Sequence, residues 1–501
     1  MSRALLCETV TGRSMAELLA ARDGATDGDM IELRLDGVGD LDVAAALSGR
    51  RRPVIVTCRP EWEGGRFDGS EETRRDILAR ALELGAEFVD VEWAALHGDQ
   101  PGFSDLLDRD GRRIVVSSHD FEGVPPDLEE RARDMRASGA SVIKIAVTAR
   151  RLADILPLRE IACRGDAVVI GMGDPGVPSR LLATRFGSRW TYAGRAVAPG
   201  QIPAARMVGE FRFPLVGPET RLFGVVSSNA MHSLSPVMHN AAFAAAGLDA
   251  AYVPLQAADF GDFLEFAAAI ELDGASVTIP FKRDALHAAG RADDLAHAVG
   301  AANTLRRNGR EWEATNTDVD GFLEPLESAL GSVAGLRVAV LGAGGSARAV
   351  IVALRSRGAH ATVHARRPEQ AEEVTASLGA SNGAWPVPPG SWDVLVNCTP
   401  LGGATLRDES PLEGGPFTGR LVYDLTYGPG ESALVRQARE AGCATLDGLP
   451  MLIAQAERQF AWWTGQKPAA GVMRRAAYER IEGRDSHRPR TAETLGRGVR
   501  S

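Results

Sequence analysis

The segment Ser141-Val142-Ile143-Lys144-Ile145-Ala146-Val147 places a single lysine inside an apolar, β-rich run. Burial of an ammonium group is costly and lowers the pKa of the amine. Such an amine is a nucleophile that can form a Schiff base with a ketone. A second apolar run, Ile114-Val115-Val116-Ser117-Ser118-His119, ends in a histidine, which can move protons near neutral pH. Each residue alone is weak evidence, because strand lysines often extend to water, but the pair favours an imine-forming lyase.

Runs of this kind recur eight times within about the first 200 residues, with segments of helical period between them. The runs span residues 4–10, 30–36, 53–59, 87–93, 113–120, 141–147, 167–173 and 190–195. Eight strand and helix units predict a compact (β/α)8 TIM barrel, with catalytic groups at the C-terminal ends of the strands. Polar residues collect at these ends in five successive runs: Glu32, Arg34, Asp36, Thr57, Arg59, Asp90, Glu92, His119, Asp120 and Lys144. The alternative, an open doubly wound sheet, would gather polar residues at one switch point.

The composition describes an ordinary globular protein of several domains. The chain has 501 residues, of which 45% are hydrophobic and 24% charged. Its net charge of −10 argues against a nucleic-acid surface or an anionic membrane as partner. Five scattered cysteines lack metal or redox spacing, so we expect reduced thiols in a cytoplasmic protein. The N-terminus meets Glu8 too early for a secretion signal, and no apolar run is long enough to span a bilayer.

Motifs of the first half occur in a definite order. They are Glu32-Leu33-Arg34-Leu35-Asp36, Thr57-Cys58-Arg59, Glu63-Gly64-Gly65, Asp90-Val91-Glu92, Ser118-His119-Asp120-Phe121, Lys144-Ile145-Ala146-Val147, Gly171-Met172-Gly173, Ser179-Arg180 and Ala198-Pro199-Gly200-Gln201. In this order they resemble type I 3-dehydroquinate dehydratase over roughly residues 1–210. One departure is Val197, where the family often carries a serine that makes a lid hydrogen bond.

The resemblance implies roles for the residues at the strand ends. Lys144 would form the imine with the C3 ketone of the substrate, and His119 would be the general acid/base. Glu92 would orient His119 or stabilise its charge. The remaining residues would bind the substrate hydroxyls and carboxylate, which arginine can bond bidentately; they are Glu32, Arg34, Arg59, Arg180 and Gln201.

A nucleotide-binding pattern lies further along the chain. The predicted strand 335–341 leads into Gly342-Ala343-Gly344-Gly345-Ser346-Ala347 and then into a predicted helix. Glycines here allow a tight turn and a close approach of the backbone to a pyrophosphate at the helix N-terminus. The next strand ends in Ala365-Arg366-Arg367, where an NAD site would place an acidic residue for the ribose. Two arginines favour a 2′-phosphate instead, and therefore NADP over NAD.

Further motifs surround this pattern, at residues 232–236, 276–282, 301–304, 316–318, 397–402, 424–427 and 447–456. Taken singly, their hydroxyls and amides are typical of helix caps and turns. In this order they resemble shikimate dehydrogenase through about residue 480. Departures are Ser276, where asparagine is common, and Gln370, where a further phosphate-binding arginine often lies.

This second resemblance implies a second set of site residues. Those that would contact the substrate are Ser233, Ser235, Thr278, Asn303, Asp318, Tyr427 and Gln455. Lys282 and Asp318 would form the catalytic pair, because ketone reduction needs a proton delivered to oxygen. Residues that would bind NADP are Gly342, Ala343, Gly344, Gly345, Ser346, Ala347, Ala365, Arg366, Arg367, Thr399 and Gly448.

Together the patterns predict an α/β chain of several parts. We expect a dehydratase barrel at 1–212, a linker at 213–220, a substrate-binding domain at 221–330, a Rossmann NADP-binding domain at 331–450, C-terminal helices returning to the substrate domain at 451–482 and a disordered tail at 483–501. The two resemblances imply that the barrel converts 3-dehydroquinate to 3-dehydroshikimate and that the second half reduces that ketone to shikimate with NADPH.

Two alternatives stay open. The second half could oxidise quinate with NAD, which Ser233 and the arginine pair argue against. The chain could also be a non-catalytic sensor of the same metabolites. A sensor could dispense with the four proposed catalytic groups Lys144, His119, Lys282 and Asp318, yet all four are present.

Overall fold

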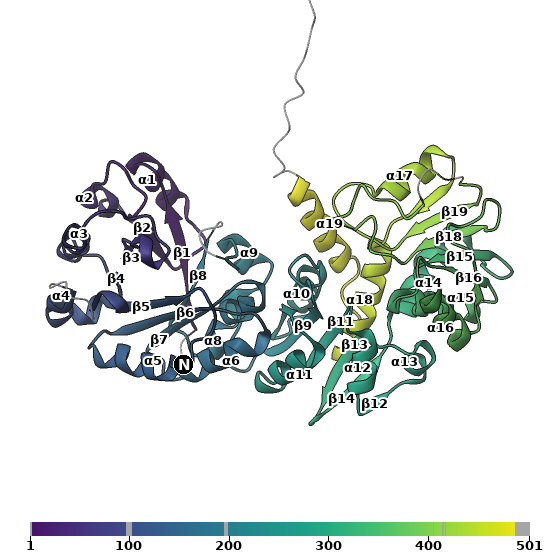
Figure 1. Cartoon of the computed structure of the whole chain (residues 1–501), viewed down its shortest axis with the longest axis horizontal. Helices are drawn as coiled ribbons and strands as arrows, with labels where there is room; N and C mark the ends of the chain where they lie inside the picture. Colours follow the sequence, from purple (N-terminus) through teal and green to yellow (C-terminus); the bar gives the residue numbers. More distant parts are fainter. Residues whose placement is uncertain are drawn as a thin grey trace, which may run out of the picture. The chain divides into compact units, whose positions relative to one another are not determined.

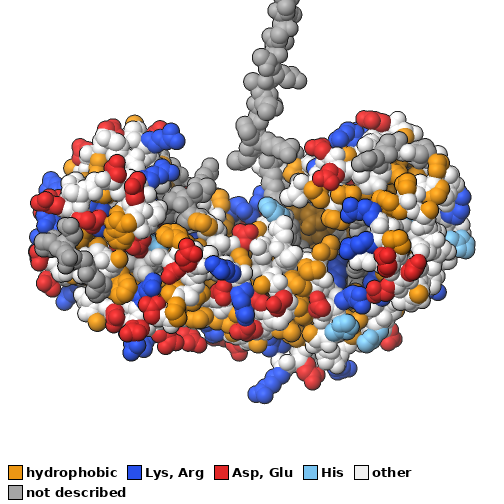
Figure 2. Space-filling model, viewed as in Figure 1, with side chains coloured by type: hydrophobic (Ala, Val, Ile, Leu, Met, Phe, Trp, Pro, Cys, Tyr) orange, Lys and Arg blue, Asp and Glu red, His pale blue; other side chains and the backbone are white. Residues whose placement is uncertain are grey.

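The computed structural model describes residues 3–96, 103–194, 199–403, 405–412, 415 and 417–485. Its described strands form three sheets, of eight, six and six strands, which follow one another along the chain (Figure 1). Across the described residues, every helix is too short or too polar to cross a lipid bilayer. Acidic, basic and hydrophobic side chains are interspersed over the face drawn in Figure 2.

The first sheet is a nearly closed parallel barrel with the strand order β7-β6-β5-β4-β3-β2-β1-β8. Arg189 N donates to Ala167 O at 3.0 Å and joins the two end strands. The strands are β1 (Leu5–Thr11), β2 (Met30–Arg34), β3 (Val54–Thr57), β4 (Phe88–Glu92), β5 (Ile114–Asp120), β6 (Val142–Thr148), β7 (Ala167–Met172) and β8 (Trp190–Ala193). All eight coincide with the predicted runs, so the barrel fold is confirmed.

Helices and short 3₁₀ turns connect the barrel strands. The helices are α1 (Met15–Gly24), α2 (Val43–Leu47), α3 (Glu71–Glu83), α4 (Phe103–Asp110), α5 (Leu128–Ala137), α6 (Leu156–Ala162), α7 (Val177–Leu181), α8 (Ala183–Phe186) and α9 (Ala204–Gly209). The turns are η1 (Glu61–Glu63), η2 (Trp93–Leu96), η3 (Gly111–Arg113), η4 (Leu152–Ile155), η5 (Asp174–Gly176) and η6 (Phe213–Leu215). Ser14, Asp42 and Ser70 cap α1, α2 and α3 by accepting backbone N–H bonds, which satisfies donors that a helix start leaves unpaired.

The barrel interior is filled by alternate strand residues, because successive side chains of a strand point to opposite faces. This inner core consists of Cys7, Met30, Ile55, Val115, Val142, Ala146, Val168, Ile170, Met172, Trp190 and Tyr192. The apolar packing occupies the middle of the barrel, so the polar strand-end residues are left at its C-terminal end.

The second sheet has the order β10-β9-β11-β13-β14-β12. Its strands are β9 (Arg221–Ser227), β10 (Ala250–Gln256), β11 (Gly274–Val277), β12 (Arg291–Ala292), β13 (Thr304–Asn308) and β14 (Glu311–Thr315). The helices that accompany it in the chain are α10 (Ser235–Ala245), α11 (Phe260–Ala269), α12 (Lys282–Ala288), α13 (Asp294–Val299) and α14 (Asp318–Leu330). β10 pairs with β9 in parallel and lies at the edge of the sheet.

The third sheet is a doubly wound nucleotide-binding sheet. Its order, β17-β16-β15-β18-β19-β20, reads 3-2-1-4-5-6 along the chain, the arrangement found in dinucleotide-binding folds. Its strands are β15 (Arg337–Leu341), β16 (His360–His364), β17 (Ser381–Asn382), β18 (Val394–Asn397), β19 (Leu421–Asp424) and β20 (Ala444–Leu446). The helices are α15 (Gly345–Ser356), α16 (Pro368–Leu378), α17 (Ala433–Glu440), α18 (Leu449–Thr464) and α19 (Val472–Asp485).

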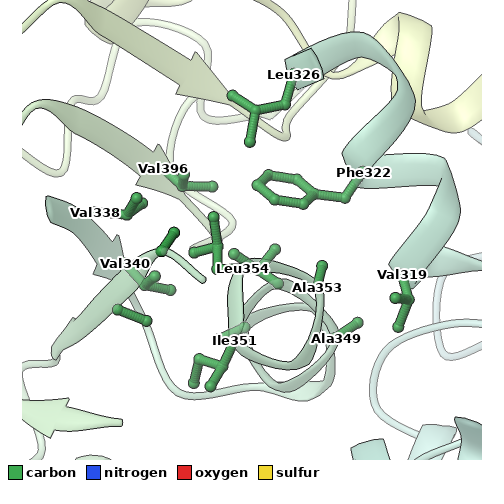
Figure 3. Packing of buried hydrophobic residues seen from close by; sticks show 14 of the residues in the cluster. Val319, Phe322, Leu326, Val338, Val340, Ala349, Ile351, Ala353, Leu354 and Val396 are labelled. Carbon is green, nitrogen blue, oxygen red and sulfur yellow. The ribbon is translucent and has the colours of Figure 1, made fainter. Parts of the chain in front are cut away.

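Helix α15 lies against this sheet through a close-packed apolar core. Figure 3 shows Ile351 and Leu354 of α15 beside Val338 and Val340 of β15, with Phe322 of α14 beside them. Small residues Ala347, Ala349 and Ala353 on α15 are fully buried and let the helix approach its neighbours closely. This packing holds the glycine-rich turn between β15 and α15 in place.

Two predicted segments differ from the structure in detail. The expected linker 213–220 contains the turn η6, and Phe213 and Val216 within it are buried. Helix α19 continues to Asp485, so the first three residues of the predicted tail, 483–485, are helical instead. Residues 486–501 of that tail lie outside the described residues.

Candidate active sites

A pocket opens at the C-terminal end of the barrel strands. It is lined by Glu32, Arg34, Arg59, His119, Lys144, Ala146, Ile170, Met172, Arg180, Tyr192 and Gln201. Seven of these are predicted site residues, and they come from strands, loops and helix α7 around the barrel. Barrel closure therefore brings them together around one cavity. Val197 and Ala198, which the sequence analysis also considered, lie outside the described residues.

Lys144 lies on β6 with only 6% of its surface exposed. Its Nζ is 3.2 Å from Asp90 Oδ2, 3.5 Å from Glu32 Oε1 and 4.3 Å from the centre of the Tyr192 ring. Two carboxylates and an aromatic face compensate for removing an ammonium group from water. The apolar run predicted a hydrophobic environment, but only the flanking residues are apolar, because the amine itself lies among charged groups.

Asp90 is fully buried below Lys144. Its Oδ1 accepts from Arg59 Nη2 at 2.8 Å and from Ser117 Oγ at 2.6 Å. Burial alone would raise the pKa of Asp90, but Arg59 and Lys144 bring that pKa well below its usual range. Asp90 is therefore a permanent negative charge that holds the lysine in position.

His119 is held by Glu63, not by the predicted Glu92. Oε1 of Glu63 accepts from the His119 backbone N–H at 3.0 Å and lies 3.0 Å from its ring Nδ1. Glu92 instead accepts from Arg59 Nη1 at 2.8 Å and forms an ion pair with Arg74. The prediction for Glu92 was wrong because its side chain, on β4, is occupied by these two buried guanidinium groups.

A tight turn after β3 brings Glu63 to the histidine. Gly64 adopts φ +74°, which is unfavourable for residues with a side chain. A Cβ added at Gly65 would lie 1.9 Å from the carbonyl oxygen of Arg59, so only glycine fits there. The motif Glu63-Gly64-Gly65 was visible in the sequence, and its glycines were the signal that could have identified this acid.

The pKa values of His119 and Glu63 differ from those of free side chains. Burial lowers the pKa of His119 well below its usual value, and the positive charges of Arg59 and Lys144 lower it further. Burial raises the pKa of Glu63 to about 7, against the opposing effect of Arg59. The imidazole is therefore neutral near pH 7 and can accept a proton.

Arg180 is a buried arginine that forms no ion pair with a carboxylate of the described residues. It is 2% exposed, and its Nη1 and Nη2 reach only the carbonyl oxygens of Tyr192 and Pro199, both at 3.4 Å. Its Nε has no hydrogen-bond partner among the residues that the structure describes. Burial lowers the pKa of Arg180 to about 10, so it remains charged at neutral pH. By contrast, Arg34 is already paired with Asp36 through bonds of 2.7 and 2.8 Å.

Three of the predicted dehydrogenase residues form one buried network. Asn303 Nδ2 donates to Asp318 Oδ1 at 2.8 Å and to Gln455 Oε1 at 3.5 Å. Asn303 Oδ1 accepts from the backbone N–H of Thr317 at 2.8 Å and from Thr304 Oγ1 at 2.7 Å. Asp318 begins α14 and Gln455 lies on α18, so the asparagine connects two helices that pack together.

The other predicted substrate residues lie at or beside the ends of helices and strands. Ser233 Oγ accepts from the backbone N–H of Ser235, a buried residue that begins α10. Thr278 follows β11. Lys282 is the first residue of α12, and its side chain is buried. Tyr427 is half-buried in the segment after β19.

The glycine-rich turn has the geometry of a phosphate cradle. Gly342 adopts φ +98°, and a Cβ there would lie 3.2 Å from Thr399 Cγ2. Helix α15 begins at Gly345, and its N-cap Gly344 provides no side-chain cap for the first N–H groups. A Cβ on Gly344 would meet nothing within 4 Å, which leaves open space before the helix. Unpaired N–H groups at an open helix start fit a pyrophosphate.

Residues at neighbouring strand ends complete this cradle. Arg366 and Arg367 are exposed directly after β16, with half-buried Ala365 before them. Thr399 follows β18 and donates from its backbone N and its Oγ1 to Asn397 Oδ1, at 2.9 and 2.7 Å. Gly448 begins the turn into α18, where a Cβ would lie 2.1 Å from the carbonyl oxygen of Leu425.

Family models match three parts of the chain. Residues 6–213 match type I 3-dehydroquinase, residues 225–305 match the shikimate dehydrogenase substrate binding domain, and residues 448–478 match the shikimate 5′-dehydrogenase C-terminal domain. The chain is also 30% identical over 502 aligned positions to the chloroplastic bifunctional 3-dehydroquinate dehydratase/shikimate dehydrogenase of Arabidopsis thaliana. That alignment covers 92% of this chain and 82% of the plant protein. The chain belongs to this bifunctional family.

As a bifunctional 3-dehydroquinate dehydratase/shikimate dehydrogenase, it is a shikimate-pathway enzyme that combines a lyase with an NADP-dependent oxidoreductase. This confirms the predicted family, fold class, enzyme classes and cofactor. The second half is 37% identical to the shikimate dehydrogenase (NADP(+)) of Moorella thermoacetica, over 52% of this chain and 93% of that protein. The solved structure of dehydroquinate dehydratase and shikimate dehydrogenase from S. pombe AroM is 23% identical, covers 95% of this chain and 98% of its own, and gives a TM-score of 0.42.

Within this bifunctional enzyme, the structure adds three barrel residues to the predicted site: Glu63, Asp90 and Tyr192. Asp90 stood among the strand-end polar residues, but its partner was not evident. The sequence did not mark Tyr192 as a site residue, because an aromatic residue in an apolar strand is typical of a core position.

Proposed function

We propose that the barrel dehydrates 3-dehydroquinate through a Schiff base on Lys144. The amine would attack the ketone carbon and release water, which leaves a protonated imine. That imine draws electrons from the neighbouring carbon, so His119 can remove a proton there and return it to the departing hydroxyl. Hydrolysis of the imine would then free 3-dehydroshikimate and the lysine.

One observation carries this proposal: Lys144, His119 and Arg180 all line the same pocket. The buried guanidinium of Arg180 forms no ion pair with any described residue and supplies the charge that a carboxylate substrate needs. Arg34, Arg59, Glu32 and Gln201 would bind hydroxyls or hold the binding groups in place.

Glu63 would position His119 for proton transfer. Its Oε1 already accepts the backbone N–H of His119, so we infer that it also accepts the ring Nδ1–H. The other ring nitrogen, Nε2, would then be the unprotonated atom that faces the substrate. An acid that orients a histidine in this way strengthens it as a base when the acid is ionised.

In the second half, we propose that Asp318 and Lys282 deliver a proton to the ketone oxygen of 3-dehydroshikimate. Asn303 fixes Asp318 through its 2.8 Å bond, and with Gln455 it would bind the ring hydroxyls. The hydroxyls of Ser233, Ser235, Thr278 and Tyr427 would complete substrate binding. These substrate-binding residues are the ones that the resemblance to shikimate dehydrogenase implied.

NADPH, when bound, supplies the hydride for this reduction. The chain's residues fit the cofactor: Gly342 and Gly344 leave the start of α15 open for the pyrophosphate. Arg366 and Arg367 would bind the 2′-phosphate of NADP, where an NAD enzyme would place an acid.

The five cysteines are free thiols in the structure, in keeping with our proposal that the enzyme works in the cytoplasm.

A coupled assay tests both halves at once. Purified enzyme supplied with 3-dehydroquinate and NADPH should form shikimate, and NADH should support the second step far less well. Borohydride added with 3-dehydroquinate should attach the mass of the reduced ligand to a peptide that contains Lys144. Comparable turnover of quinate with NAD would favour the oxidative alternative, and binding of the metabolites without turnover would favour a sensor.

A further inference from the structure

The edge strand of the second sheet is covered by the barrel. β10 terminates its sheet, yet its residues from Ala250 to Leu255 are all buried. Edge strands expose unpaired backbone groups and require a covering element. Here the barrel elements η5 and α7 contact β10. All five residues of α7 are buried as well, although α7 is an outer helix of the barrel.

A carboxylate of α11 caps a barrel turn. Asp262 is 3% exposed, and its two oxygens accept from the backbone N–H groups of Leu152 and Ala153, each at 2.9 Å. These residues begin η4, where the N–H groups have no partner within the turn. Arg151 Nε lies 3.3 Å from the same carboxylate. An acid 110 positions later in the chain therefore acts as the helix cap.

Two arginines of the barrel cap the C-terminal end of α11. Arg159 of α6 donates to the carbonyl oxygen of Ala269, the last residue of α11. Arg185 donates to the carbonyl oxygen of Ile270 at 3.1 Å. Cations are favourable at a helix C-terminus, where carbonyl groups lack partners. In Figure 1, α6 and α11 lie side by side at this junction.

We propose that α11 and β10 of the dehydrogenase half are a docking surface that positions the dehydratase site. Contacts run from α11 to η4, from η4 to η5 and from η5 to α7, the helix that carries Arg180. Because α7 is fixed on both sides, the angle at which Arg180 enters the pocket depends on Asp262. The dehydratase barrel is thus completed by a residue of the other enzyme. Only the kinetic part of this inference rests on the proposed role of Arg180.

The test uses the full-length chain with Asp262→Ala and Asp262→Asn. A matched control is Asp42→Asn, since Asp42 also accepts two backbone N–H bonds but within its own helix start. Hydrogen exchange of a peptide spanning 150–156 should accelerate about tenfold in Asp262→Ala. The reason is that losing a buried hydrogen bond raises the equilibrium constant for local opening on the order of tenfold. The control should leave this peptide unchanged.

Kinetics give the second readout. In both Asp262 variants the KM for 3-dehydroquinate should rise about fivefold to tenfold, while reduction of 3-dehydroshikimate stays within about twofold of wild type. If Asp262→Ala does not fold, Arg159→Met removes a contact from the barrel side and should have the same effect. Unchanged exchange at 150–156 would refute the docking surface, and faster exchange with an unchanged KM would refute its link to Arg180. Failure to trap Lys144 in the wild-type enzyme would refute the proposed function instead.

Discussion

Replacing Arg180 with methionine should weaken substrate binding and stabilise the free enzyme at the same time. Arg180 is buried, and burial lowers its pKa from the ordinary arginine value to about 10, which disfavours the charged form by about 3 kcal/mol. In the free enzyme this cost is not offset by an ion pair with any described residue. A substrate carboxylate would offset it, so the charge contributes to binding and opposes folding.

The magnitudes follow from these contacts. Loss of a charge-assisted, bidentate contact costs up to about 3 kcal/mol, so the KM for 3-dehydroquinate should rise about 100-fold. Arg180→Met also removes an uncompensated buried charge, while it forfeits only two weak bonds of 3.4 Å. We expect about 2 kcal/mol of added stability, seen as a rise of about 5 °C in the unfolding temperature of the barrel.

Arg34→Met is the matched control. Arg34 lines the same pocket but is paired with Asp36. Among the described residues, its removal leaves that buried carboxylate with only the backbone N–H of Arg66. This variant should therefore unfold at a lower temperature, in contrast to Arg180→Met. Steady-state kinetics and differential scanning calorimetry on the full-length proteins measure both effects. A KM within twofold of wild type, or a lower unfolding temperature for Arg180→Met, would contradict the reasoning.

The remaining predictions concern the two catalytic centres. Lys144→Ala should abolish dehydration and borohydride trapping but leave NADPH-dependent reduction near wild type, and Lys282→Ala should do the reverse; loss of both activities in either folded variant would count against separate sites. The dehydratase rate should rise with pH through about 7 as Glu63, whose pKa burial raises to about 7, becomes ionised and makes the neighbouring histidine a stronger base. Glu63→Gln should remove that step from the pH–rate profile, and a profile that keeps it would exclude Glu63 as its source. Serine at Arg366 and Arg367 should raise the KM for NADPH at least about tenfold with little change for NADH, because each charged contact to a phosphate is worth about 1.5–3 kcal/mol; equal losses for both cofactors would argue against 2′-phosphate binding.

Local sequence patterns determined the fold class and most of the candidate residues. Strand period, strand length and the turn at Gly342 depend on neighbours a few positions away, so they can be read along the chain. The same holds for Lys144 and His119, which are recognisable as polar residues inside or after apolar runs. Barrel topology then requires such strand ends to meet at one face, which is why the pocket was predictable from their positions alone.

The partner of each charged group was decided only by the tertiary structure. Glu63 lies after β3 and Glu92 is the last residue of β4, yet Glu63 contacts His119 while Glu92 is held by two arginines. The sequence likewise gives no sign that Arg180 forms no ion pair with the described residues, or that Asp262 caps a turn 110 positions earlier. Such pairings join residues from distant parts of the chain, and they depend on a few ångströms of side-chain reach that only the closed barrel and the packed α11 define.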